Sequence, residues 1–261
     1  MRENYIDYLP ELDDLQRSFN DTQRRKMVKI GQAFFSAKFF VASILIFVSG
    51  LFTLCSFAGP YWSQSYPSTG NEFKNIGLWE ACFYRYRHWK DDNQKPYTGC
   101  FWFWSPDMIR FRDWIMPPWF IAVQFFACFG LIFTFVVLAF LAVSFMTNIR
   151  FKFYFVFPIT ILTFFAQINM FLALLVYGIN GDNREWMPRP EFNVYSWSYW
   201  FELVASFFML IATILLLLES KVLYIIYKKN RAIKRQYETA LPLNSNLNLN
   251  MNASLSNSNY A

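Results

Sequence analysis

The sequence predicts an all-α membrane protein: a four-transmembrane-helix bundle with a small extracellular antiparallel β-sheet formed mainly by the first outer loop. Three observations lead to this fold class. Four apolar runs each reach about the twenty residues that a helix needs to cross a bilayer. Only 16% of the residues are charged, well below the roughly 25% of a soluble domain. The longest segment between the runs is rich in aromatic residues, which favour β-strands.

The apolar runs divide the chain into alternating loops and helices. We expect an N-terminal tail at 1–38, helices at 39–58, 119–145, 155–178 and 197–220, a first outer loop at 59–118, a short inner loop at 146–154, a second outer loop at 179–196 and a C-terminal tail at 221–261. The inner loop is so short that the helices on either side of it must be antiparallel neighbours. The end of the tail is rich in Asn and Ser, and we expect it to be disordered.

The residues that flank the runs support these helix boundaries. Gly59-Pro60 ends the first run, and Pro117-Pro118 precedes the second. Pro158 falls in the first turn of the third helix, where a missing N–H costs little. Trp197 begins the fourth helix at the level where aromatic belts form.

The distribution of Lys and Arg predicts that both termini lie in the cytosol. Basic residues gather just before the first run and just after the fourth, as the positive-inside rule requires of cytosolic segments. The net charge is +6, and we expect these basic residues to contact anionic lipid rather than nucleic acid. The first run is too long for a cleaved signal sequence, and we expect an uncleaved signal anchor.

The first outer loop carries the clearest strand signals. Residues 77–90 have high β-propensity and no proline, and Asp91-Asp92-Asn93 marks a turn before a returning strand at 97–104. Strict alternation would place Phe83, Arg85 and Arg87 on one face of the first strand and Cys82, Tyr84 and Tyr86 on the other. The loop is thus predicted to form a small antiparallel sheet.

Cys82 and Cys100 are the two cysteines of this loop, which would mature in an oxidising compartment. We expect a disulfide between them, closing a loop of about 19 residues and contributing about 3 kcal/mol. Cys55 and Cys128 lie inside apolar runs, where we expect them to act as small apolar side chains.

The sequence offers little for catalysis, and we expect no enzyme activity, no cofactor and no metal site. The only histidine, His88, has no second metal ligand near it and is expected on a strand surface. Transporters and membrane enzymes usually need ionisable groups in their spans, but Glu202 lies near a helix end and no charge falls at mid-membrane. We expect the polar span residues Gln124, Gln167 and Asn169 to form interhelical hydrogen bonds.

The loop residues resemble a family signature. Trp62, the triplet Gly77-Leu78-Trp79, and then Cys82 and Cys100 resemble the W–GLW–C–C pattern of the claudin superfamily, the PMP22/EMP/claudin-type tetraspan proteins. Arg112, or alternatively Arg110, matches the arginine near the end of the same loop. The wide spacing of the cysteines and the long N-terminal tail are most similar to the divergent claudins of invertebrate septate junctions, such as Sinuous, Megatrachea and Pasiflora.

The resemblance implies both an architecture and a role. It implies a left-handed four-helix bundle whose extracellular sheet is anchored near the outer leaflet by the tryptophans of the signature. It implies a plasma-membrane protein of lateral cell–cell junctions that limits paracellular diffusion and associates with similar junctional proteins in cis and in trans. The alternative is an auxiliary subunit of an ion channel or receptor, because calcium-channel gamma subunits share the loop signature.

Two groups of loop residues are candidates for these contacts. The aromatic candidates for adhesion in the second outer loop, expected to be exposed, are Trp186, Phe192 and Tyr195. The charged candidates for ion selectivity are Arg85, Arg87, Lys90, Asp91 and Asp92. A cytosolic scaffold is a further candidate partner, although the terminal Tyr260-Ala261 is a weak fit for a PDZ pocket.

Overall fold

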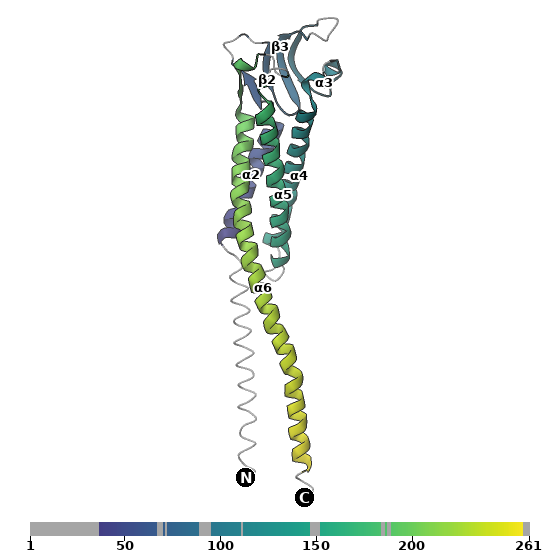
Figure 1. Ribbon diagram of the computed structural model, residues 1–261, viewed down its shortest axis with the longest axis vertical. Coiled ribbons are helices and arrows are strands. Elements are labelled where there is room, and N and C mark those ends of the chain that lie inside the picture. Colours follow the sequence, from purple (N-terminus) through teal and green to yellow (C-terminus); the bar gives the residue numbers. More distant parts are fainter. Residues whose placement is uncertain are drawn as a thin grey trace. The chain divides into compact units, whose positions relative to one another are not determined.

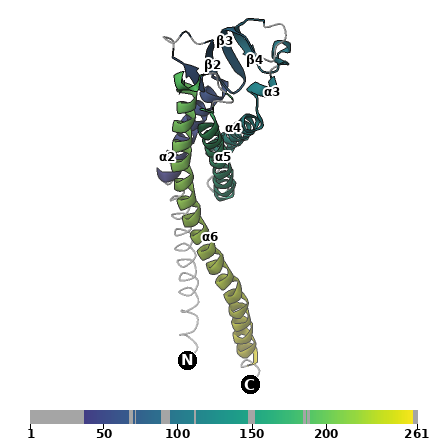
Figure 2. The ribbon, with the colours of Figure 1, turned by 45° about the horizontal axis from the view of Figure 1, so that its top comes forward.

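The computed structural model describes residues 37–66, 70, 72–88, 95–110, 112–146, 152–183, 186 and 189–257. Its long helices are α2 (Ala37–Ala58), α4 (Pro118–Met146), α5 (Lys152–Asn180) and α6 (Trp197–Asn257). Each contains a segment long and apolar enough to cross a membrane. Within the unit Phe34–Leu217 the helices run side by side, and the strands gather at one end of them (Figures 1 and 2). The predicted fold class is confirmed.

Helix α6 differs from the prediction at its C-terminal end. We expected a helix over 197–220 followed by a disordered Asn/Ser-rich tail, whereas α6 continues to Asn257. Its residues from Leu218 onward belong to a compact unit separate from the bundle, which comprises Phe34–Leu217. The physical reason is that a helix already nucleated adds one hydrogen bond for each further residue, so weak helix formers can extend it.

Small residues bring the helices of the bundle close together. A Cβ on Gly50 of α2 would lie 3.2 Å from Leu138 of α4, and one on Gly130 of α4 would lie 3.1 Å from Met170 of α5. The Ser49 hydroxyl of α2 donates to the Ala205 carbonyl of α6 at 2.8 Å. Close backbone approach and hydrogen bonds of this kind favour helix association in lipid, where the hydrophobic effect between helices is absent.

Only one of the three polar span residues behaves as predicted. Gln167 of α5 donates to the Ser206 hydroxyl of α6 at 3.1 Å, an interhelical bond. Asn169 instead donates to the Phe165 carbonyl of its own helix at 2.8 Å. Gln124 bonds to the loop between α2 and α4 rather than to a helix. The prediction was therefore wrong for Asn169 and Gln124.

The loop between α2 and α4 forms an antiparallel sheet with one strand from the second loop, and we call it the loop sheet. Its spatial order is β4-β3-β2-β1-β5. The strands are β1 (Ser63–Ser65), β2 (Phe73–Ile76), β3 (Glu80–Tyr86), β4 (Tyr97–Trp102) and β5 (Asn193–Tyr195). The short helices η3 (Pro106–Met108) and α3 (Arg112–Ile115) follow β4, and η5 (Pro190–Phe192) directly precedes β5. The contribution of β5 was not predicted.

The alternation predicted for β3 breaks near its end. The β3–β4 register shifts between Phe83 and Tyr86, and Arg85 has a φ of 54°. This irregularity turns Tyr86 to the side of Phe83, so that both are buried and their rings stack 4.9 Å apart. Tyr84 stays exposed on the opposite side. The assignment of Tyr86 to the face of Tyr84 was wrong because a bulge inserts one extra residue into the pleat.

Candidate functional site

The triplet Gly77-Leu78-Trp79 forms the turn between β2 and β3. The Gly77 amide donates to the Glu80 carbonyl at 2.9 Å, leaving Leu78 and Trp79 as a two-residue loop. Gln124 of α4 donates to the Leu78 carbonyl at 2.6 Å, and the ring of Trp79 lies 5.0 Å from that of Phe57, in the last turn of α2. The turn is thus docked onto the ends of two apolar helices.

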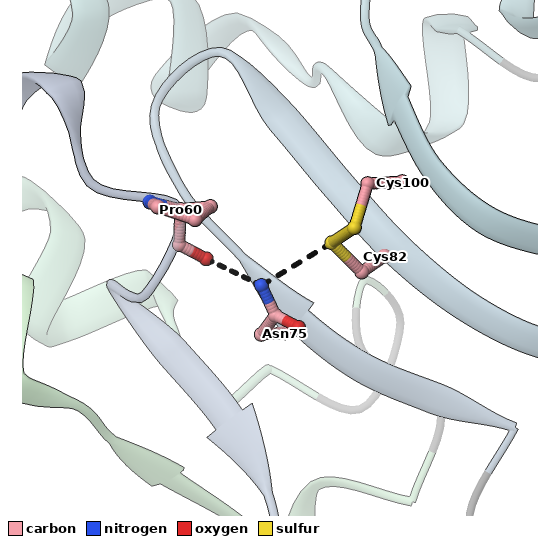
Figure 3. The surroundings of a disulfide bond; sticks show 4 residues. All are labelled: Pro60, Asn75, Cys82 and Cys100. Carbon is pink, nitrogen blue, oxygen red and sulfur yellow. Dashed lines mark hydrogen bonds between the residues drawn. A yellow bond between two sulfur atoms is a disulfide. The ribbon is translucent and has the colours of Figure 1, made fainter.

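Gly77 is required by the close approach of two backbones. A Cβ at this position would lie 2.5 Å from the Pro60 Cα and 2.6 Å from the Gly59 carbonyl oxygen. Real Cβ atoms essentially never come so close to other atoms, and backbone atoms cannot turn aside. Asn75 of β2 reinforces the contact by donating to the Pro60 carbonyl at 2.8 Å (Figure 3). The Gly59-Pro60 linker is thus pressed against the end of β2.

Trp62 connects the end of α2 to the other helices. Its side chain is fully buried, and its indole N–H donates to the Ser56 carbonyl at 3.1 Å. Its ring meets Tyr177 of α5 edge-on at 4.9 Å and Tyr199 of α6 at 5.9 Å. The main chain of Trp62 also accepts from the Ser196 amide at 3.0 Å, just after β5. One residue therefore joins three helices and the loop sheet.

Tyr177 is a central residue that sequence reasoning missed. It is fully buried near the end of α5, and its hydroxyl shares a hydrogen bond with that of Ser63 on β1 at 2.9 Å. A tyrosine near the end of an apolar run is typical of an aromatic belt, which is the signal that could have identified it. Here the phenol faces inward, where a polar handle needs a partner.

The structure joins Cys82 and Cys100 by a disulfide between β3 and β4 (Figure 3). The two residues are directly opposite each other in the strand register. The side-chain amide of Asn75 also lies 3.4 Å from the Cys82 sulfur. Asn75 therefore links the disulfide to the Pro60 carbonyl, and through it to the linker that follows α2.

The predicted signature arginine lies at the start of α3. The Arg112 guanidinium lies 5.5 Å from the centre of the Trp104 ring. Arg110 is exposed and precedes α3.

The three aromatic candidates for adhesion differ in exposure. Trp186 is only 4% exposed, its indole N–H donates to the Ile115 carbonyl at 3.0 Å, and its expected exposure was wrong. Tyr195 is half-buried, and its hydroxyl donates to the Gly178 carbonyl at 3.0 Å. Burial, together with the negative charge of Asp182, raises the pKa of Tyr195 to about 12. Phe192 is exposed.

The described charged candidates lie on and beside the far end of β3. Arg85 and Arg87 are both exposed. The Arg85 guanidinium and the Lys74 ammonium each lie 5.5 Å from the centre of the Tyr84 ring. The other candidates, Lys90, Asp91 and Asp92, lie outside the described residues.

The described residues around the docked turn are mainly apolar and aromatic. Within the described ranges, no three His, Cys, Asp or Glu residues are placed to hold a metal ion. His88 is 1% exposed and packs 4.8 Å from the Trp114 ring, so its expected position on a strand surface was wrong. Glu202 is also buried, near Ser56 at the same end of the bundle.

A comparison with protein families agrees with this arrangement. Residues 47–218, which are more than half of the chain and include all the signature residues, match the family described as PMP-22/EMP/MP20/Claudin tight junction. No curated protein matches the chain. The family match and the helix-docked GLW turn lead to one conclusion: the chain belongs to the PMP-22/EMP/MP20/claudin family of membrane proteins.

Proposed function

We propose that this protein is a claudin-like component of cell–cell junctions of the septate or tight type. It would contribute to adhesion and to the paracellular diffusion barrier at lateral plasma membranes. The observation that carries the proposal is the docking of the loop sheet onto the helix ends through Trp62, Gly77 and Trp79. A sheet held in this way keeps a fixed orientation to the membrane, as a barrier between apposed cells requires.

The proposed orientation puts the loop sheet outside the cell and both termini in the cytosol. Basic residues after the fourth apolar segment support it, since cytosolic flanks carry an excess of Lys and Arg. The Cys82–Cys100 disulfide supports it too, because such bonds persist in oxidising compartments. The C-terminal tail is then available to a cytosolic scaffold.

We assign adhesion to the edge strand β5 and its neighbour β1. The Tyr66 amide donates to the Phe192 carbonyl at 3.0 Å, and their side chains are 49% and 38% exposed. Exposed aromatic side chains on a rigid edge are typical anchors of protein interfaces. Tyr195 supports this edge from the half-buried side through its bond to Gly178. Trp186 contributes from the core rather than by direct contact.

We assign charge selectivity to the segment around the far end of β3. Lys74, Arg85 and Arg87 outnumber the exposed Glu72 beside them, so the described part of this surface is positively charged and would favour anions over cations along it. Lys90, Asp91 and Asp92 belong to the same loop and would modify this preference. Selectivity therefore depends on the balance of charge across the β3–β4 loop.

The experiment is expression in cultured cells that lack such junction strands. We expect the protein to concentrate where two expressing cells touch and to lower the paracellular flux of a small tracer. A Tyr66→Ser/Phe192→Ser variant should reach the surface but lose the concentration at contacts. The matched control is Tyr84→Ser, which removes an aromatic as exposed as Tyr66 from β3, two strands away from β1. Uniform distribution of the unmutated protein, with copurification of a channel subunit, would contradict the proposal.

A further inference from the structure

Two exposed tryptophans flank a buried phenylalanine where β4 ends. Trp102 and Trp104 are 57% and 55% exposed, whereas Phe103 between them is fully buried. A monomer rarely leaves two neighbouring indoles open to water without a reason, since large exposed apolar patches usually mark contact surfaces. Lipid or another protein could cover the two indole rings.

The position of Phe103 fixes the level of this turn along the bundle. Its ring lies 5.7 Å from that of Phe120, which is in the first turn of the apolar helix α4. Its amide donates to the Trp79 carbonyl at 3.0 Å, and Trp79 in turn packs against Phe57 in the last turn of α2. The turn therefore lies at the level where two apolar helices end, which is the level of the lipid headgroups.

Arg112 adds a charge to the same place. Its guanidinium lies 5.5 Å from the centre of the Trp104 ring, so the indole holds the cation beside the exposed pair. Two acidic residues lie close to Arg112 in the sequence. The Asp107 carboxylate forms an ion pair with Lys95 at 3.5 Å, and Asp113 directly follows Arg112. A guanidinium group and a phosphate group can form two parallel hydrogen bonds. At the level of the headgroups, Arg112 is therefore suited to bind the phosphate of a lipid.

We propose that Trp102, Trp104 and Arg112 form a contact site for phospholipid headgroups in the leaflet nearest the loop sheet. The indoles enter the interface, where tryptophan is favoured, and the guanidinium binds a phosphate. Phe125, further along α4 than Phe120, is 56% exposed. The site tethers the β4 edge to the membrane, complementing the docking of the β2–β3 turn. The inference goes beyond the proposed function and does not depend on it.

The test is a depth measurement by electron paramagnetic resonance. Cys55 and Cys128 are replaced by Ala, the disulfide is kept, and a nitroxide is attached to Trp102→Cys or Trp104→Cys. The protein is placed in nanodiscs of phosphatidylcholine, and collisions with oxygen are compared with those with a water-soluble nickel chelate. Phe125→Cys on α4 supplies the hydrocarbon reference. Arg87→Cys, just beyond the end of β3 away from the docked turn, supplies the aqueous reference.

We expect the ratio of oxygen to nickel collisions at both test positions to lie between the two references. A ratio equal to the aqueous reference would overturn the proposal and leave the surface free for another protein. A ratio equal to the hydrocarbon reference would overturn the assignment to headgroups. In each case an unmutated Trp remains at the other test position, and a Tm equal to that of the unlabelled protein verifies folding.

The role of Arg112 is tested with the label at position 102. Arg112→Gln should move this label toward the aqueous value, because the phosphate contact is lost while the shape of the side chain is roughly kept. Arg112→Lys should retain most of the depth, since its ammonium still binds phosphate as a point charge. Equal depth in the Gln variant and the unmutated protein would exclude Arg112 from the site.

Discussion

Gly77→Ala is the substitution that most directly probes the docking of the GLW turn. The added methyl carbon would lie 2.5 Å from the Pro60 Cα, whereas carbon atoms in contact are normally about 3.5–4.0 Å apart. Relief requires the end of β2 or the Gly59-Pro60 linker to move by about 1 Å. Both are backbone segments, and the hydrogen bond from the Asn75 side chain to the Pro60 carbonyl holds one against the other.

The expected cost follows from these distances. Overpacking of this kind costs about 1–3 kcal/mol, while replacing glycine gains about 0.4–1 kcal/mol from the lower entropy of the unfolded chain. Taking the middle of each range, about 2 kcal/mol minus about 0.7 kcal/mol, we expect a net loss of about 1.3 kcal/mol, or a fall in Tm of about 3–5 °C for a domain of this size. The assay is thermal unfolding in detergent micelles, followed by intrinsic tryptophan fluorescence.

Gly50→Ala is the matched control. Its Cβ would meet only the ends of side chains, at 3.2 Å from Leu138 and 3.3 Å from Thr134, so small rotations can relieve the contact. We expect its Tm to remain within about 2 °C of the unmutated protein, less than the fall expected for Gly77→Ala. If Gly77→Ala unfolds at the same temperature as Gly50→Ala, the backbone contact at Pro60 does not explain why the triplet carries a glycine, and the account of the docked turn is wrong.

Three further predictions concern the residues around the turn. Trp62→Phe removes the donor to the Ser56 carbonyl and part of the buried ring, and thermal unfolding should show a loss of about 1–3 kcal/mol. Gln124→Leu leaves the buried Leu78 carbonyl unsatisfied at a similar cost, measured in the same way, whereas an unchanged Tm would contradict the role of this bond. The pKa of Tyr195 is raised from 10.0 to about 12, so the folded state favours the neutral phenol. Its contribution to stability is complete below pH 10 and is lost between about pH 10 and 12; a pH titration of Tm should show a smaller alkaline loss for Tyr195→Phe.

The features that sequence predicts well are those set by local composition. Long apolar runs fix the spanning helices because backbone groups in lipid must bond within the segment. The returning strand at 97–104 was close to the observed β4, since aromatic and β-branched residues lie between turn signals. The pairing of Cys82 with Cys100 follows from their shared loop.

The missed features depend on contacts between distant segments. The bulge at Arg85 has no glycine to announce it, so strict alternation misplaced Tyr86. Trp186 looked like an exposed loop aromatic, but it is buried because it packs against Trp119 of α4 at 4.7 Å. Gln124 looked like an interhelical residue, although its partner is a loop carbonyl. In each case the deciding partner is far away in sequence.

The orientation of the loop sheet is the central claim, and glycosylation mapping in microsomes tests it most directly. The chain has native acceptor sequences at Asn20-Asp21-Thr22 and Asn252-Ala253-Ser254, and a third is to be engineered beside the exposed Tyr66. We predict glycan addition at the engineered acceptor alone, which would place Cys82, Cys100 and the GLW turn outside the cell. Modification at Asn20 or Asn252, with none at the engineered acceptor, would put the sheet in the cytosol and contradict the junctional function.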